Sequence, residues 1–390
     1  MIKKIVYGKQ FVDNKDVALV TKALKEEKIS SGKLVKKFEN KLKSIFKSKY
    51  TLSCSSGTAG LHLAMMSINL KKDDVVLMPA INFIASYSVA KILGAKIYLV
   101  DVDEYSGQMT PELINQCIKE NKLKKIKAIV CMHLAGNIKN MMNLYKIKKK
   151  YKSILIEDAC HALGSKYMHG GKLINVGKCQ HSDIAVFSFH PLKSITTGEG
   201  GLISTNNKKI NQRLNLLRSH GIERNKKKYW EYNIKSPGLN YRISDINCAL
   251  GISQVKKLSS FIKKRRNIAK NYILLLKPFE KIIKTPSKHE IINSACHLFI
   301  ISINFKKINS TKDIFLKFMN KKNIFPQFHY IPIFKFDFFK FNQKKNFKNA
   351  LNYYNNCVSI PIYYKLSSID QKYVVKCINK FICLSKNNIV

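Results

Sequence analysis

The sequence predicts an α/β protein with a large domain on a mainly parallel sheet and a smaller C-terminal α+β domain. From about residue 50 to residue 205, short β-rich runs alternate with helical stretches, the pattern of a largely parallel sheet. After residue 206 the pattern becomes helical, and a second β signal follows at residues 297–304. The 390 residues, 45% of them hydrophobic, suffice for one large core or two adjoining ones. We expect the large domain, with an N-terminal arm, at residues 1–255 and the small domain at residues 256–390.

The predicted strands are short apolar runs bounded by polar or turn-forming residues. They cover residues 50–55, 75–79, 96–102, 128–133, 154–158, 184–189 and 201–204. Between them we predict helices at residues 82–93 and 141–150, and one that opens at Thr110-Pro111-Glu112 with a cap, a proline and an early acid. Residues 246–261 and 263–276 favour two long amphipathic helices, and residues 311–320 a further helix. The asparagine-rich patches near the C terminus favour loops or tails.

The net charge of +46 would favour nucleic acid or anionic membrane surfaces as partners. The basic residues, however, are spread over nearly every segment and are almost all lysine, with only six arginines. Arginine is the residue favoured for bidentate recognition of phosphate and guanine, and no nucleic-acid-binding motif is present. We therefore predict no nucleic-acid partner.

Ten cysteines are scattered singly, without a C-x-x-C pair or a His/Cys cluster at zinc spacing. This spacing favours a reducing cytosol over a disulfide framework and predicts no metal site. Cys54, Cys131, Cys160 and Cys248 have apolar neighbours and are expected as small core residues. The sequence has no signal-peptide core and no apolar stretch long enough to cross a membrane, so we expect a cytoplasmic protein without a membrane partner.

Polar residues directly follow three of the predicted strands, where ligands bind in parallel sheets. At the first strand end, Ser56-Gly57-Thr58 opens a helix rich in small residues. Free amides at a helix start, with hydroxyls beside them, suit a phosphate group. The alternative is an ordinary helix cap without a ligand.

At the second strand end, Asp158 follows four apolar residues, with His161 three positions later. An acid there can hold a protonated ring nitrogen because the opposite charges stabilise each other in a site of low dielectric. His161 can pack over a flat ring or cap a loop. The alternative for Asp158 is a helix cap or a salt-bridge partner.

At the third strand end, Ser188 and His190 share one side of the strand by the period-two alternation. Lys193 follows, and the segment TTGEGG then permits a tight return into another strand. A phosphate cradle, a carboxylate for a pyridine nitrogen and a strand-end lysine are the minimal equipment for binding pyridoxal phosphate. This combination distinguishes Lys193 from the many other lysines of the chain.

Five segments together resemble the DegT/DnrJ/EryC1 family of nucleotide-sugar aminotransferases: SSGTAGLHLAM, EDACHALGS, FSFHPLKSITTGEGG, LRSHGI and GLNYRISDINCALGISQV. The similarity extends from Tyr7 to the late segment FHYIPIF, which is nearly the whole chain. The resemblance implies the aspartate-aminotransferase-like fold (fold type I), pyridoxal 5′-phosphate as the cofactor and L-glutamate as the amino donor. It also implies a homodimer with active sites at the subunit interface.

The resemblance assigns roles to individual residues. It implies that Lys193 forms the Schiff base and moves protons, that Asp158 pairs with the pyridine nitrogen and that Phe83 stacks on the ring, although Asn82 stands where the family usually has Ser or Thr. Asn240 would reach the phosphate region of the neighbouring subunit's site. The implied cofactor-binding residues are Ser56, Gly57, Thr58, Phe83, Asp158, His161, Ser188, Lys193 and Asn240. The implied substrate-binding residues are Tyr7, Glu27, Lys28, Ile29, Ser30, Gly57, Ser188, Asn240, His329, Tyr330, Ile331 and Pro332.

Four of these residues also have a structural interpretation. Phe83 can be a core residue, Asn240 a turn residue and His329 a member of an aromatic cluster, while Tyr7 can serve only to anchor the N terminus. The resemblance is what favours the functional interpretation for each of them.

Within the family, SFHPLKSITTGEGG and HYIPIF look most like the branch that makes pseudaminic-acid precursors. This implies amino transfer from L-glutamate to C4 of UDP-2-acetamido-2,6-dideoxy-β-L-arabino-hex-4-ulose, giving UDP-4-amino-4,6-dideoxy-N-acetyl-β-L-altrosamine. A different UDP- or dTDP-ketosugar is the main alternative. A sugar dehydratase of the same superfamily would carry histidine in place of Lys193, which argues against that activity. A catalytically silent relative or a basic nucleic-acid binder is the alternative from another class.

Overall fold

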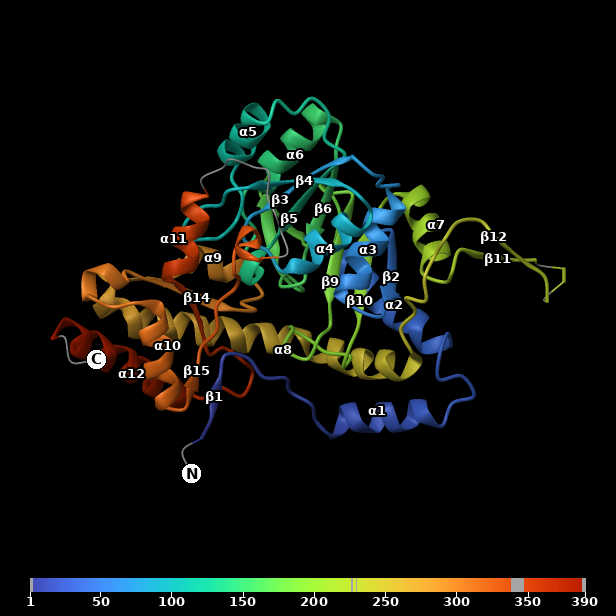
Figure 1. Ribbon diagram of the computed structural model, residues 1–390. Coiled ribbons are helices and arrows are strands. Elements are labelled where there is room, and N and C mark those ends of the chain that lie inside the picture. Colours follow the sequence, from blue (N-terminus) through green and yellow to red (C-terminus); the bar gives the residue numbers. More distant parts are fainter. Residues whose placement is uncertain (1–2, 226, 229, 338–346, 388–390) are drawn as a thin grey trace.

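A computed structural model describes residues 3–225, 227–228, 230–337 and 347–387. Its centre is a seven-stranded sheet with the strand order β2-β10-β9-β6-β5-β3-β4 (Figure 1). Only β10 runs antiparallel to its neighbours β2 and β9, and the remaining strand pairs are parallel. The strands are β2 (Tyr50–Cys54), β3 (Val75–Pro79), β4 (Lys96–Val100), β5 (Ala128–Met132), β6 (Ile154–Asp158), β9 (Ile184–Ser188) and β10 (Gly201–Thr205). The predicted α/β class with a mainly parallel sheet is confirmed.

Alternate residues of each strand pack into different cores on the two faces of the sheet. In β6, Ile154 and Ile156 contact one core and Leu155 the other. By the same alternation, Asp158 lies on the face of Ile156, while Glu157 lies on the opposite face. Helices α3 (Gly57–Ser67), α4 (Ile84–Ile92) and α7 (Lys208–Leu217) cover the first face. Helices α2 (Lys33–Phe46), α5 (Pro111–Glu120) and α6 (Met141–Tyr151) cover the second.

The predicted pair of helices around residue 262 is one continuous helix, α8 (Asp245–Leu276), of 32 residues. Neither glycine nor proline interrupts the sequence between Gly251 and Leu276, so nothing in the chain breaks the helix there. Its first half packs on the core beneath the sheet, through Leu258 and Phe261. Its second half packs on the C-terminal core, through Ile268 and Tyr272. Helix α1 (Asn14–Leu24), which sequence reasoning missed along with α2, lies against α8 (Figure 1).

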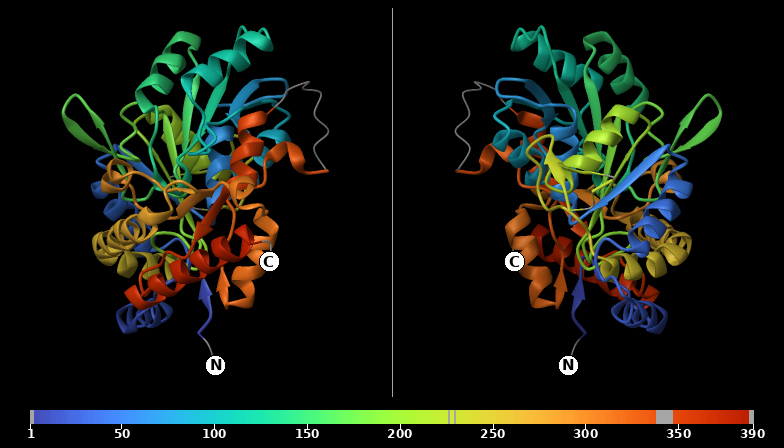
Figure 2. Two further views of the ribbon diagram at one scale, coloured as in Figure 1. Left: turned by 90° about the vertical axis from the view of Figure 1, so that its left-hand side faces the viewer. Right: turned by 90° about the vertical axis from the view of Figure 1, so that its right-hand side faces the viewer.

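The C-terminal part surrounds a small antiparallel sheet of β13 (Ile283–Lys284), β14 (Phe299–Ile303) and β16 (Cys357–Ile360). Its helices are α9 (Lys288–Asn293), α10 (Lys312–Lys321), α11 (Lys348–Asn356) and α12 (Ser368–Lys386). The N-terminal strand β1 (Ile5–Val6) pairs with β15 (Ile324–Phe325) beside these elements, as Figure 2 shows. Helix α11 lies in one of the asparagine-rich patches for which we predicted loops or tails, so that prediction is wrong there.

The division into domains near residue 256 stays a prediction. Helix α8 runs through that position, and Ile5 packs in the C-terminal core although it belongs to the predicted range of the large domain.

Two hairpins project from the body: β7 (Lys166–His169) with β8 (Lys172–Asn175), and β11 (Ile222–Arg224) with β12 (Tyr232–Ile234). The second of these extends far from the rest of the chain (Figure 1).

Candidate active site

A cavity of about 400 Å³ opens at the carboxyl ends of β2, β6 and β9. The three strand-end segments expected to form a site therefore meet in one place. The N-terminal segment and the C-terminal part complete the wall. The predicted residues that line this cavity are Tyr7, Ser56, Gly57, Thr58, Phe83, Asp158, His161, Ser188, Lys193, His329 and Tyr330.

The start of helix α3 forms one end of the cavity. Ser56 is the N-cap, and its side chain accepts a hydrogen bond from the Ala59 amide. Within the described part of the chain, the amides of Gly57 and Thr58 have no acceptor, as expected for the first turn of a helix. A Cβ on Gly57 would lie 2.9 Å from Cβ of Ser188, so a larger residue would close the space that these amides face.

Asp158 lies at the end of β6 and is 2% exposed. Ser86 Oγ donates to its Oδ2 at 3.1 Å, and the Cys160 amide donates to its Oδ1 at 3.2 Å. Among the described residues, none forms a salt bridge with it. A buried carboxylate is costly without a cationic partner, so Asp158 is prepared to receive a positively charged group from a ligand.

Lys193 follows β9 in a turn whose backbone is held by its N–H bond to the His190 carbonyl at 2.9 Å. Burial lowers the pKa of its amine below the ordinary value, while the nearby Cys160 and Asp158 oppose this shift. The chain then returns into β10, where Gly201 comes so close to Ser56 that a Cβ would lie 2.3 Å from the Ser56 carbonyl oxygen. The Gly-rich segment thus lets β10 pass the start of α3 and presents Lys193 to the cavity.

Three histidines gather beside Lys193. The His161 and His297 ring centroids are 4.3 Å apart, and those of His161 and His329 are 6.3 Å apart. Burial, and after it the charge of Lys193, lowers the pKa of all three, for His329 to about 3. The histidines are therefore neutral at physiological pH. Tyr330 reaches the same cluster, with its hydroxyl 3.0 Å from His161 Nε2.

The other predicted site residues lie outside the cavity wall. Asn240 is exposed and forms a bridge with Ser219, so in one chain it does not contribute to the cavity. Ile331 and Pro332 follow Tyr330 but do not line the cavity. The remaining four are exposed on the segment between α1 and α2: Glu27, Lys28, Ile29 and Ser30.

Several lining residues were not predicted. Cys160 was expected in the core, yet it is only partly buried and lines the cavity, because the turn after β6 directs it toward Lys193 and Gly57. His297, which also lines the cavity, comes from the start of the small sheet. Ser86 does not line the cavity but reaches Asp158 from α4 behind it. His297 and Ser86 have no local sequence signal, because only tertiary packing brings them to the strand ends. The other unpredicted lining residues are Leu61, Ala85, Met132, His190, Leu192 and Glu199.

The cavity fits pyridoxal phosphate by the chemistry of its groups. Two free amides at a helix start suit a phosphate, a buried carboxylate suits a protonated ring nitrogen, and a lysine with a lowered pKa suits an aldehyde carbon. The volume lies in the range of small-molecule sites. These groups come from three separate strand ends and converge on one space.

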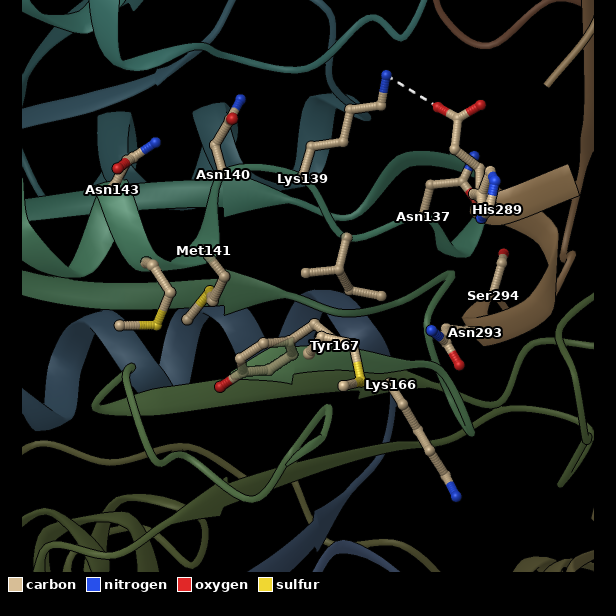
Figure 3. Close-up of a pocket in the computed structure, with 14 residues that line it drawn as sticks. Asn137, Lys139, Asn140, Met141, Asn143, Lys166, Tyr167, His289, Asn293 and Ser294 are labelled. Carbon is tan, nitrogen blue, oxygen red and sulfur yellow. Dashed lines mark ion pairs between the residues drawn. The ribbon is translucent and has the colours of Figure 1, made fainter. Parts of the chain in front are cut away.

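A second cavity, of about 380 Å³, lies between α6, β7 and α9 (Figure 3). Its wall combines polar and apolar side chains, and Lys139 pairs there with Glu290 at 2.9 Å. It shares no lining residue with the cavity of Lys193. Within the described ranges, no group of three potential metal ligands occurs, and no helix is long and apolar enough to span a membrane.

Comparison with known proteins agrees with the chemistry of the site. Residues 10–379 match the model of the DegT/DnrJ/EryC1/StrS aminotransferase family. The chain is 35% identical over 373 residues to the UDP-4-amino-4,6-dideoxy-N-acetyl-beta-L-altrosamine transaminase of Campylobacter jejuni, covering 95% of each protein. It is 34% identical over 380 residues to the uncharacterized protein MJ1066 of Methanocaldococcus jannaschii, covering 95% of this chain and 96% of that one.

Solved structures show the same fold. The aminotransferase PseC of Helicobacter pylori, involved in the biosynthesis of pseudoaminic acid, superposes with a TM-score of 0.88 at 27% identity, covering 97% of this chain and 99% of that one. The putative sugar aminotransferase Spr1654 of Streptococcus pneumoniae, in its PMP form, gives a TM-score of 0.86 at 24% identity, covering 98% and 100%.

The fold is thus that of the pyridoxal-phosphate-dependent aminotransferases, with the candidate site at the carboxyl ends of the strands. The chain belongs to the DegT/DnrJ/EryC1/StrS aminotransferase family. It is a sugar aminotransferase that depends on pyridoxal phosphate.

Proposed function

We propose that this enzyme transfers the amino group of L-glutamate to C4 of UDP-2-acetamido-2,6-dideoxy-β-L-arabino-hex-4-ulose. The observation that carries the amino-transfer chemistry is the pair of Asp158 and Lys193 in one cavity: a buried carboxylate without a cation, and an amine with a lowered pKa. The choice of sugar is supported by the 35% identity to the Campylobacter jejuni transaminase over 95% of the chain. The product would be UDP-4-amino-4,6-dideoxy-N-acetyl-β-L-altrosamine.

Each residue of the site has a distinct task in this proposal. When bound, pyridoxal phosphate supplies the electron-accepting ring that amino transfer requires. The Gly57 and Thr58 amides and Ser188 bind the phosphate, and Asp158 holds a proton on the ring nitrogen. Lys193 would hold the cofactor at its aldehyde carbon, and its amine, whose pKa is lowered by burial, would move the proton at Cα of glutamate.

We propose that Phe83 covers the cofactor ring. It is 49% exposed in the single chain, and its ring lies 5.6 Å from that of Tyr330. An aromatic side chain this exposed at the mouth of a cavity is better explained by a ligand than by the core. Tyr7 and His329 complete the wall on the side where we propose that the sugar nucleotide binds, and their rings are 5.2 Å apart.

We propose that the active enzyme is a homodimer in which each subunit completes the other's site. Asn240 and the segment from Glu27 to Ser30 are exposed rather than in their own chain's cavity, as expected if they act on a second copy. The hairpin β11–β12 projects away from the body, and its Tyr232 and Ile234 side chains are 60% and 51% exposed, which favours burial against a partner.

We also propose a cytoplasmic location. The ten cysteines, all unpaired, support a reducing compartment.

The test is a mass-spectrometric screen of UDP- and dTDP-linked 4-ketosugars with L-glutamate and the purified, cofactor-loaded protein. We expect amination of the UDP-linked L-arabino-hexulose at the highest rate. Turnover of another ketosugar in its place would reject this substrate while keeping the aminotransferase. Amination at C3 would reject the proposed position on the sugar.

A further inference from the structure

The hydrogen bonds of His161 determine which of its ring nitrogens carries the proton. The Ala135 amide donates to His161 Nδ1 at 3.3 Å. A backbone N–H can only donate, so Nδ1 accepts and has no hydrogen of its own. Burial holds the pKa of His161 well below its ordinary value, with the charge of Lys193 as the next cause, so the ring is neutral. Its single hydrogen is therefore on Nε2.

The backbone around Ala135 holds this donor in place. Ala135 has a φ of 60° in a short turn, and the His297 amide donates to its carbonyl at 3.0 Å. The His297 ring packs 4.3 Å from that of His161. A residue from the small sheet thus supports both the donor and the ring that accepts from it.

His161 in turn determines the direction of the Tyr330 hydroxyl. With its hydrogen on Nε2, His161 donates to Tyr330 Oη across 3.0 Å, and the hydroxyl accepts. In the described part of the chain Tyr330 Oη has no other partner. Its own hydrogen is therefore available to the cavity that Tyr330 lines. Burial and the neighbouring Asp158, Cys160 and Tyr7 raise the pKa of Tyr330 well above its ordinary value, so it stays protonated.

We propose that Tyr330 donates a hydrogen bond to an oxygen of the bound ligand, and that His161 is the positioning residue that directs this donor. This inference rests on the proposed function. The acceptor is an oxygen at the reaction centre, because Tyr330 lines the same cavity as Lys193 and Asp158. Its ring centroid lies 5.6 Å from that of Phe83 and 6.0 Å from that of His161. Two sources have this chemistry: the ring oxygen of pyridoxal phosphate and the carbonyl oxygen of the amino acceptor. The role differs from general substrate contact, since it requires one direction of hydrogen bonding along Ala135, His161 and Tyr330.

The first experiment compares Tyr330→Phe with the wild type by two measurements on cofactor-loaded protein. One is the pH titration of the absorbance of the lysine-bound cofactor. The other is the single-turnover return of the amino group from the pyridoxamine form to 2-oxoglutarate, which needs no sugar. A donor to the ring oxygen stabilises its anion, so its loss raises the pKa of the absorbance change by about one unit. A donor to the carbonyl oxygen leaves that pKa unchanged, and its loss slows the return reaction by on the order of 100-fold.

The second experiment tests the direction of the hydrogen bonds with a matched pair of variants. In His161→Gln, the amide can accept from Ala135 and still donate to Tyr330, as the histidine does. In His161→Glu, the carboxylate can only accept, which draws the Tyr330 hydrogen away from the cavity. We expect the rate of the return reaction in His161→Gln to stay within about threefold of the wild-type rate. We expect His161→Glu to reproduce the effect of Tyr330→Phe in the same measurements. The same pair in the Tyr330→Phe background measures the effect of the added charge alone.

A change in the absorbance titration identifies the cofactor as the acceptor, and a slower return reaction identifies the carbonyl. The proposal is overturned if Tyr330→Phe changes neither the absorbance titration nor the rate of the return reaction. It is also overturned if His161→Gln and His161→Glu differ in these measurements no more with Tyr330 present than in the Tyr330→Phe background. Failure of every ketosugar in the screen would reject the proposed substrate, yet both measurements would still decide the role of Tyr330.

Discussion

At the scale of the residue, the buried Asp158 and the partly buried Lys193 give the site its chemistry. Asp158 is 2% exposed and is held by Ser86 and the Cys160 amide, and Lys193 lies near enough for their charges to interact. Asp158 was predictable from sequence because a polar residue at the end of an apolar strand must emerge at the sheet edge. Lys193 was predictable only in combination with the other two strand-end sites, which suit the same cofactor. The direction of the Tyr330 hydroxyl was not predictable, because it depends on Ala135 and His161, which are distant from it in sequence.

Asp158→Asn removes the negative charge, and with it one of the two oxygens that accept hydrogen bonds from Ser86 and the Cys160 amide. Asparagine keeps the volume and an acceptor for Ser86, but it cannot hold a proton on a ring nitrogen by charge. We expect the turnover number to fall by on the order of 100-fold or more, while the protein still folds. Steady-state kinetics with saturating cofactor measures this. Turnover within a few-fold of the wild type would show that the carboxylate is not required.

At the scale of the element, the main differences between prediction and structure are the missed helices α1, α2 and α11 and the division of α8. The strands of the large sheet and β14 were predictable because apolar runs between turn residues have few other solutions, whereas the short strands outside the large sheet were missed. Helix α8 was predicted as two helices because its apolar face changes from one core to another along its length, which disturbs the periodicity without breaking the helix. Helix α11 was missed because asparagine disfavours helices, and here burial of Ala350 and Tyr353 outweighs that preference.

The start of α3 yields a prediction about cofactor affinity. Gly57→Ala places a Cβ 2.9 Å from Cβ of Ser188 and 3.3 Å from Cys160 Sγ, which narrows the phosphate end of the cavity. We expect the dissociation constant for pyridoxal phosphate to rise by on the order of tenfold or more. Gly60→Ala in the same helix is the control, since its Cβ would press on Val186 in the core. It should lower stability without weakening cofactor binding, and equal affinities of the two variants would contradict the assignment.

The whole molecule brings the site together from distant parts of the chain. Tyr7, the strand ends of the large sheet, and His297, His329 and Tyr330 of the C-terminal part line one cavity. This convergence is why sequence reasoning without the family resemblance favoured structural roles for Tyr7 and His329. It also buries several histidines in the neutral state, which links the stability of the fold to pH.

The free energy of unfolding should fall in acid because of these histidines. Their pKa values are lowered in the folded protein, for His329 from 6.5 to about 3, so the unfolded chain binds protons that the folded chain does not. The stability is fully present above about pH 6.5 and is lost as the pH falls toward 3, by about 1.4 kcal/mol per pH unit for each such histidine. Urea unfolding at several pH values in this window measures the slope. His329→Gln should reduce that slope by the share of one histidine, and identical slopes would contradict the proposed neutral state.

The most direct test of the central claim is the absorbance of the purified protein after loading with pyridoxal phosphate and addition of L-glutamate. If Lys193 binds the cofactor and the enzyme accepts an amino group from glutamate, the loaded protein is yellow and glutamate bleaches the absorbance of the lysine-bound cofactor. Lys193→Ala should lack this absorbance and lose turnover. A wild-type protein that stays colourless in excess cofactor, or a Lys193→Ala variant with full turnover, would contradict the account.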